Sequence, residues 1–237
     1  MRTDEQVRME SQAHLLKECT LERVGVGGSR RNCYKLGDSG YCVKFYKPPE
    51  ECVPGKMKKS IIADIAKRRF DRKRNSSAME VDYYFSHWLK MPPEVTEKLL
   101  PHVELVEHPQ WGYGILETYY TNPDGTAIIP FQNELRRQKD HMETKREIYR
   151  QVRNLLRVLI REAAYFFEPG NFHTLLRADG GVETKIVDFE PTAKTLIPLE
   201  RWFPAFRRFK LRRKAIRYLR SMREDFGVDI EAETDIG

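Results

Sequence analysis

The sequence predicts an α+β fold in which a β-rich N-lobe is followed by a small helical C-lobe. Two observations predict it. Short segments with period-two alternation, separated by turns containing Gly, fill residues 21–46. Longer segments with apolar residues at the 3.6-residue period of a helix dominate the second half. We expect an N-terminal extension at 1–20, the N-lobe at 21–120, the C-lobe at 121–225 and a tail at 226–237.

The composition is that of a folded, basic protein. Of 237 residues, 40% are hydrophobic, which is enough for a core and excludes a disordered chain. The formal net charge is +7. No apolar run approaches the roughly 18 residues needed to span a bilayer. Residues Met1 to Met9 are charged rather than apolar, so no signal peptide is visible and we expect a cytoplasmic protein.

The cysteines show no metal-binding spacing. There are four of them, with no CxxC pair and no His at ligand spacing, which excludes a zinc site of the usual kind. In a reducing compartment they are expected to be buried thiols rather than disulfides. They are Cys19, Cys33, Cys42 and Cys52.

Three strands are expected at the start of the N-lobe. The first is Leu21–Val24, and a glycine-rich turn over residues 25–29 follows it. Asn32–Leu36 and Tyr41–Tyr46 form the next two, joined by a Gly-Asp-Ser-Gly turn. Two further strands are expected near Val103–Glu107 and Gly112–Tyr119.

A helix is expected between these strand groups. The basic segment 56–74 precedes it, with nine Lys or Arg against two Asp. Ser76 or Ser77 would cap the helix, and Pro92-Pro93 would end it. Its apolar face is predicted to be Val81, Tyr84, Phe85, Trp88 and Leu89.

The C-lobe is predicted from two helices and a hairpin. Residues 145–164 hold the 3.6-residue period most strongly. Phe172–Leu176 and Glu183–Val187 indicate a hairpin. The last helix, 201–223, has ten Lys or Arg and no acidic residue. Its apolar positions are Leu211, Ala215, Tyr218, Leu219 and Met222.

Chemistry-bearing residues follow one another in a fixed order along these elements. A glycine turn lets backbone N–H groups approach phosphate closely, and a lysine in an apolar strand adds a cation. A glutamate near a helix start would orient that lysine. An amide oxygen and a carboxylate on either side of a hairpin suit Mg²⁺, which prefers oxygen ligands. In order, these residues are Gly25, Gly27 and Gly28, then Lys44, Glu80, Asn171 and Asp188.

That order matches the parts of the protein-kinase fold and predicts binding of Mg-ATP. Each part alone has an ordinary structural explanation: a hairpin turn, a solvent-facing Lys44, a surface Glu80, a capping or turn Asp188. The joint order is what favours a kinase-like fold.

Several stretches resemble the YrbL family, the PhoP regulatory network proteins. The resemblance covers roughly residues 21–222 and implies a kinase-like, bacterial, cytosolic protein. It also implies that Lys44, Glu80, Asn171 and Asp188 are nucleotide and metal positions. The matching stretches are residues 31–34, 42–44, 80–84 and 196–202, the last reading Leu-Ile-Pro-Leu-Glu-Arg-Trp.

The sequence departs from an active protein kinase at three positions. Phe166 stands where the catalytic Asp is usual, five residues before Asn171. Glu168 replaces a common lysine, and Glu190 replaces the glycine after Asp188-Phe189. A missing general base costs roughly 10²–10⁴-fold in rate. Glu168 is the candidate substitute, although a surface carboxylate is the simpler interpretation.

Two functions remain open. In the first, the chain binds ATP and Mg²⁺ and either phosphorylates a small molecule slowly or acts as a non-catalytic regulator, a pseudokinase. No Ala-Pro-Glu motif follows Asp188, and few residues remain to dock a protein substrate. In the second, the basic C-terminal helix binds a partner or nucleic acid, nucleic acid being less favoured. Trp202, Phe203, Phe206 and Phe209 interleave with arginines there and are expected to be core anchors.

Overall fold

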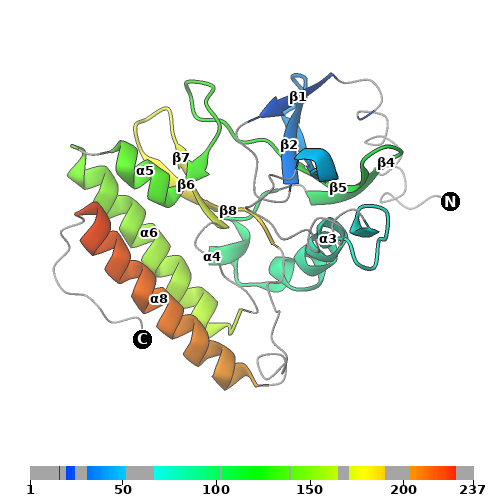
Figure 1. Cartoon of the computed structure of the whole chain (residues 1–237). Coiled ribbons are helices and arrows are strands. Elements are labelled where there is room, and N and C mark those ends of the chain that lie inside the picture. The colour runs from blue at the N-terminus through cyan, green and yellow to red at the C-terminus, as the bar shows by residue number, and fades with distance from the viewer. Residues whose placement is uncertain are drawn as a thin grey trace. The chain divides into compact units, whose positions relative to one another are not determined.

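A computed structural model of the chain describes residues 16, 20–24, 31–51, 67–101, 103–138, 140–164, 171–189 and 203–227, without the side chains of 225 and 226 (Figure 1). The chain divides into two compact units. The first comprises Met1–Tyr84 and Pro101–Tyr119, and the second Phe85–Leu100 and Tyr120–Gly237. None of the described helices is long and apolar enough to cross a membrane.

The first unit is built on a five-stranded antiparallel sheet with strand order β1-β2-β3-β5-β4. All five strands were predicted from the alternation and turn signals, with ends that differ by no more than one residue. The strands are β1 (Leu21–Val24), β2 (Arg31–Leu36), β3 (Tyr41–Tyr46), β4 (Val103–His108) and β5 (Gly112–Thr118).

Strand β3 lies at the centre of this sheet. Its pairing register sets Lys44 opposite Cys33 of β2 and opposite Ile115 of β5. Close packing on β5 requires glycine at position 114, because a Cβ there would lie 2.5 Å from the ring of Phe45. The buried core of the sheet consists of Leu36, Val43, Phe45, Val106 and Leu116.

Helix α3 (Ser76–Ser86) begins at a residue that sequence reasoning did not choose. The cap is Asn75, whose Oδ1 accepts hydrogen bonds from the backbone N–H of Ser77 at 2.8 Å and of Ala78 at 3.2 Å. The prediction of Ser76 or Ser77 as the cap was therefore wrong. The amide nitrogen of Asn75 also donates to the backbone oxygens of Arg68, Arg69 and Tyr113.

The single apolar face predicted for this helix is not observed. Helix α3 ends at Ser86, and Trp88 lies in the short 3-10 helix η2 (Trp88–Lys90). Phe85 and Leu89 are exposed, because the chain leaves the helical period before the predicted face is complete. The Pro92-Pro93 pair does not end a long helix; it begins the short helix α4 (Pro93–Thr96). Another 3-10 turn, η1 (Pro49–Glu51), follows β3.

The second unit combines helices with a three-stranded sheet of order β6-β7-β8. The predicted hairpin is present, as are both predicted long helices. Figure 1 shows α8 lying alongside α6. The elements are α5 (Phe131–Arg137), α6 (Met142–Arg161), α8 (Pro204–Phe226), β6 (Ile129–Pro130), β7 (Phe172–Leu176) and β8 (Val182–Ile186).

Candidate functional site

Lys44 lies in β3 as part of a largely buried ion pair. Its Nζ is 2.6 Å from Oε1 of Glu117, and the two side chains are 17% and 5% exposed. Glu117 comes from β5, directly opposite Cys42. The Cys42 thiol donates to the same Oε1. The pKa of Cys42 is raised far above its usual range by its hydrogen bond with Cys33, by burial and by the charge of Glu117.

Glu117 is a residue that sequence reasoning missed. The available signal was a carboxylate at the end of the otherwise apolar run Gly-Ile-Leu-Glu of β5. A buried carboxylate needs a partner, since an isolated buried charge is very costly. The ion pair explains how Lys44 is held in an apolar strand, and it removes the interpretation of Lys44 as a solvent-facing lysine.

Glu80 lies in α3 and is fully buried, so it is not an ordinary surface glutamate. Its Oε2 is 2.5 Å from a guanidinium nitrogen of Arg31 in β2. The ion pair connects the helix to the sheet within the first unit. That Glu80 orients Lys44 stays a prediction.

Asn171 and Asp188 are adjacent in space although they are 17 residues apart in sequence. The backbone N–H of Val187 donates to the oxygen of Asn171 at 2.8 Å, which extends the β7–β8 pairing by one step. The amide nitrogen of Asn171 donates to the backbone oxygen of Asp188. The side-chain atom of Asn171 that can serve as a metal ligand is therefore Oδ1. The hairpin brings both residues to the same end of its strands. That their side-chain oxygens share a Mg²⁺ stays a prediction.

Asp188 has an unusual backbone conformation. Its φ is 59°, in the left-handed region, which it shares with Ala163 alone among the described non-glycine residues. This region is unfavourable for residues with a Cβ, though less so for Asp and Asn. Strain of this kind persists where surrounding contacts impose it, and it concentrates at functional sites.

Buried contacts hold the chain on both sides of Asp188. Phe189 is buried against Trp88 of η2, with ring centroids 5.8 Å apart. On the other side, the N–H of Ile186 donates to the oxygen of Lys98 at 2.8 Å. Trp88 was predicted only as part of a helix face, and its position against Phe189 was not foreseen.

A shared carboxylate fixes the hairpin to the segment before it. Glu183 of β8 lies 3.1 Å from Nζ of Lys98 and 2.8 Å from Nζ of Lys185. Burial alone would raise the pKa of Glu183, but the two lysines lower it below the usual value. The Lys185 ammonium also lies 5.2 Å from the ring centroid of Tyr120. These contacts join β8 to Lys98 and Tyr120.

The donor set suits one kind of metal. Among the described residues, no three His, Cys, Asp or Glu side chains form a group that could hold an ion by themselves. Mg²⁺ is usually bound by one or two carboxylates together with substrate phosphates. One carboxylate and one amide oxygen therefore fit a magnesium–phosphate complex better than a metal centre built from protein ligands alone.

Several predicted site residues lie outside the described residues. The glycine turn and the candidate base remain predictions without structural detail, as does the expected position of the aromatic ring that replaces the catalytic Asp. These residues are Gly25, Gly27, Gly28, Phe166, Glu168 and Glu190.

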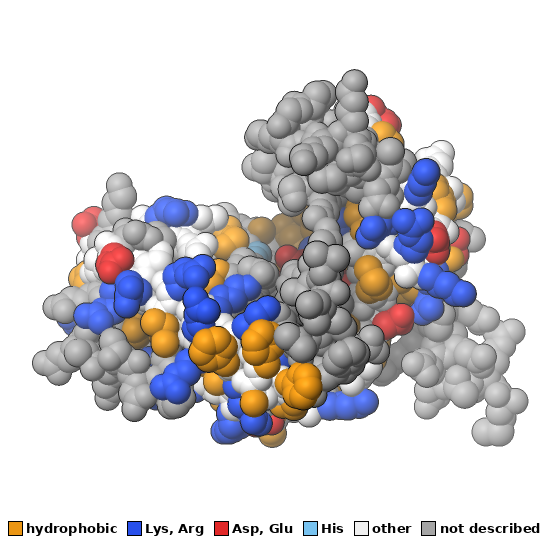
Figure 2. Space-filling model, turned by 60° about the horizontal axis from the view of Figure 1, so that its bottom comes forward, with side chains coloured by type: hydrophobic (Ala, Val, Ile, Leu, Met, Phe, Trp, Pro, Cys, Tyr) orange, Lys and Arg blue, Asp and Glu red, His pale blue; other side chains and the backbone are white. Residues whose placement is uncertain are grey.

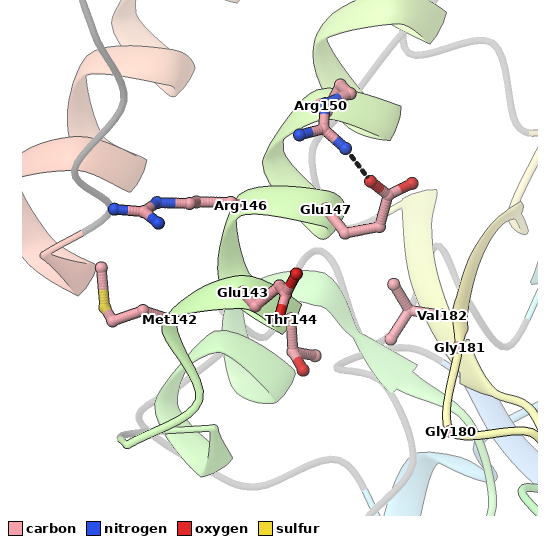
Figure 3. A pocket seen from close by; sticks show the side chains of 9 residues that line it. All are labelled: Met142, Glu143, Thr144, Arg146, Glu147, Arg150, Gly180, Gly181 and Val182. Atoms are coloured by element: carbon pink, nitrogen blue, oxygen red, sulfur yellow. Dashed lines mark hydrogen bonds and ion pairs between the residues drawn. The ribbon is translucent and has the colours of Figure 1, made fainter.

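The second unit also contains an open hollow of about 790 Å³ (Figure 3). It lies between the start of α6 and the β7–β8 turn, and an ion pair joins Arg150 to Glu147 at its wall. Gly180 and Gly181 belong to the turn, whereas Asn171 and Asp188 lie at the open end of the hairpin. Five residues of strand separate the two ends by about 16 Å. The hollow is therefore distinct from the candidate site.

Comparison with known proteins adds little to these residues. No protein-family model matches the sequence, and no curated protein matches it. Among solved structures, the chain is similar to the crystal structure of choline kinase LicA from Streptococcus pneumoniae, at 13% identity and a TM-score of 0.32. The similarity covers 95% of this chain and 90% of that one. A TM-score this low carries no functional argument.

Proposed function

We propose that the chain is a kinase-like nucleotide-binding protein, as its resemblance to the YrbL family implies, and that its ligand is Mg-ATP. It either transfers phosphate slowly to a small molecule or acts as a non-catalytic regulator. The observation that carries the proposal is the juxtaposition of Asn171 and Asp188 at the end of a braced hairpin. Strained backbone conformations concentrate at functional sites, and a carboxylate and an amide oxygen are both suitable ligands for Mg²⁺.

Each residue has a role in this proposal. Oδ1 of Asn171 and the Asp188 carboxylate would hold Mg²⁺, which would neutralise phosphate charge. Lys44 would contact the phosphates, with Glu117 keeping its ammonium in place. The glycine turn, Gly25, Gly27 and Gly28, would offer backbone N–H groups to the phosphates.

Rapid phosphate transfer needs a group that accepts the proton of the acceptor hydroxyl. Phe166 cannot accept a proton from an acceptor hydroxyl. Phosphoryl transfer depends mainly on positioning and electrostatics, so transfer without that base would be slow rather than abolished. Glu168 is the residue proposed to accept the proton if transfer occurs.

Thermal unfolding with and without ligand tests the binding half. A ligand that binds only the folded state, at a concentration of 100 times its Kd, adds about 2.7 kcal/mol to the free energy of unfolding. We expect Mg-ATP to raise the Tm by several degrees, and ATP with a chelator to raise it less. An unchanged Tm at millimolar Mg-ATP would contradict the proposal.

A matched pair of variants makes the test specific. Asp188→Asn removes the proposed metal carboxylate and should abolish the extra shift that Mg²⁺ gives. Asp179→Asn changes an exposed aspartate at the turn of the same hairpin and should leave that shift unchanged. If both variants keep the extra shift that Mg²⁺ gives, Asp188 does not bind the metal.

A further inference from the structure

The surface of α8 opposite its core contacts combines charge and apolar side chains. One side of the helix is buried through Leu211, Ala215, Leu219 and Met222, and α8 packs on α6. On the opposite side, Phe209, Arg213, Ile216 and Arg220 follow one another at spacings of four, three and four residues. Those spacings place the four side chains along one line of the helix. We call this line the outward stripe.

The outward stripe is exposed and has basic flanks. Phe209 is 55% exposed, and Ile216 is also exposed. Figure 2 shows hydrophobic side chains grouped among Lys and Arg side chains on the face that it brings forward. No acidic residue lies between Pro204 and Arg223. The flanking exposed arginines are Arg208, Arg212 and Arg217, and exposed Phe203 lies just before the helix.

These exposures correct an expectation from the sequence. Phe203 and Phe209 were expected to be core anchors, and both are exposed instead. Trp202 lies outside the described residues, and Phe206 is only partly buried. The reason lies in the register of the helix, because the core side is already occupied by the aliphatic positions from Leu211 to Met222.

We propose that the outward stripe docks the protein on an anionic lipid bilayer. A helix lying in the membrane plane uses apolar side chains at the boundary between headgroups and acyl chains, and basic side chains on lipid phosphates. Both kinds of side chain occur here on one exposed line. Arginine can reach a phosphate while its aliphatic stem lies against apolar neighbours.

The aromatic contacts favour lipid over a polynucleotide. The guanidinium of Arg213 lies 5.6 Å from the ring centroid of Phe209, and the ammonium of Lys210 lies 5.2 Å from that of Phe206. These pairs keep basic and apolar groups together on the exposed side of the helix, which suits the boundary between lipid headgroups and acyl chains. Ile216 has no role on a polynucleotide, whereas a lipid boundary accommodates it. The docking function is independent of nucleotide binding.

Co-sedimentation of the whole protein with vesicles tests the proposal. We expect binding to phosphatidylcholine vesicles that contain phosphatidylglycerol, and little binding to phosphatidylcholine alone. Phe209→Ala should weaken the binding severalfold, since the ring no longer enters the lipid boundary. The substitution is at an exposed helical position and favours the helix, so the variant should fold.

The chain offers a matched control for Phe209. Phe70 is 53% exposed and also has an arginine over its ring, Arg69 at 5.5 Å, but it belongs to the first unit. Phe70→Ala should leave vesicle binding unchanged. An equal loss in the two variants would show that any exposed phenylalanine suffices, and would overturn the proposal.

Arginine substitutions test the contribution of charge to vesicle binding. Arg212→Gln with Arg217→Gln should lower partitioning about 30-fold, because each basic group near an anionic surface contributes to binding. Arg72→Gln with Arg136→Gln removes the same charge elsewhere and should have a much smaller effect. Absence of binding to the anionic vesicles would overturn the proposal. Stronger binding to single-stranded RNA that survives Phe209→Ala would also overturn it and assign the face to nucleic acid.

Discussion

Phe189 packs edge-on against Trp88, with ring planes 64° apart and both side chains buried. Asp188 immediately precedes Phe189, and its backbone oxygen accepts the amide of Asn171. Because the chain is continuous, burial of the Phe189 ring limits where the backbone of Asp188 can lie. An apolar contact thus positions a polar residue that is itself in a strained conformation.

Replacing Trp88 should be costly. Trp88→Ala removes a buried aromatic side chain and is expected to lower the free energy of unfolding by about 3–5 kcal/mol. Leu89→Ala, at the exposed neighbouring position, should change it by less than about 0.5 kcal/mol. Urea unfolding curves measure both. Similar values for the two variants would contradict the packing described here.

The ion pair of Lys44 and Glu117 should behave as a coupled unit. Lys44→Met removes the ammonium that pairs with the buried carboxylate of Glu117. It should lower the free energy of unfolding by about 3 kcal/mol. Adding Glu117→Gln should recover part of that loss, which a double-mutant cycle measures.

The double variant also separates stability from function. If Lys44 contacts phosphate, calorimetric titration should show weaker Mg-ATP binding even in the folded double variant. Wild-type affinity in that variant would remove Lys44 from the nucleotide site.

Substitutions at Asp188 should separate backbone strain from metal binding. Asp188→Gly removes the Cβ that disfavours a φ of 59°. It should be more stable than Asp188→Ala by about 1 kcal/mol. Asp188→Asn should resemble the wild type in stability, since Asn tolerates this region. All three should lose the Mg²⁺ dependence of ATP affinity in titrations with and without a chelator. A Gly variant less stable than the Ala variant would argue against backbone strain.

His87 should make the second unit sensitive to acid. Burial, with contributions from Arg207 and Lys90, lowers the pKa of His87 from 6.5 to about 4. Between those pH values the unfolded chain binds a proton at His87 that the folded chain does not. The contribution of His87 to the free energy of unfolding is therefore complete above pH 6.5 and decreases as the pH falls toward 4. Allowing for solvent screening of this partly exposed group, the loss is about 1 kcal/mol.

His87→Gln removes the titrating group and should flatten this part of the stability–pH profile. Chemical unfolding of both proteins across that range measures the difference. Parallel profiles for wild type and variant would show that His87 does not titrate as described.

The elements that the sequence predicted are those with local signals. Alternation and Gly turns define β2 and β3, and the hairpin that joins Asn171 to Asp188 turns at Gly180, whose φ is 80°. Contacts between distant segments could not be predicted in this way. Glu117 reaches Lys44 only because β5 pairs with β3 across more than 60 intervening residues. Asn75 became the cap in place of Ser76 because its amide also bonds carbonyls from two other segments.

The chain passes from the first unit into the second at Phe85, returns at Pro101 and leaves again at Tyr120. The segment Phe85–Leu100 contacts residues that are synthesised much later, for example through the β-bridge between Leu99 and Ile186. A fragment ending at residue 120 would carry the segment without these partners and expose its apolar side chains to aggregation. During synthesis the same exposure lasts for roughly 90 residues of translation, or about 5–20 s. Codon usage and chaperone access over residues 101–186 should therefore affect the yield of folded protein more than either does elsewhere in the chain.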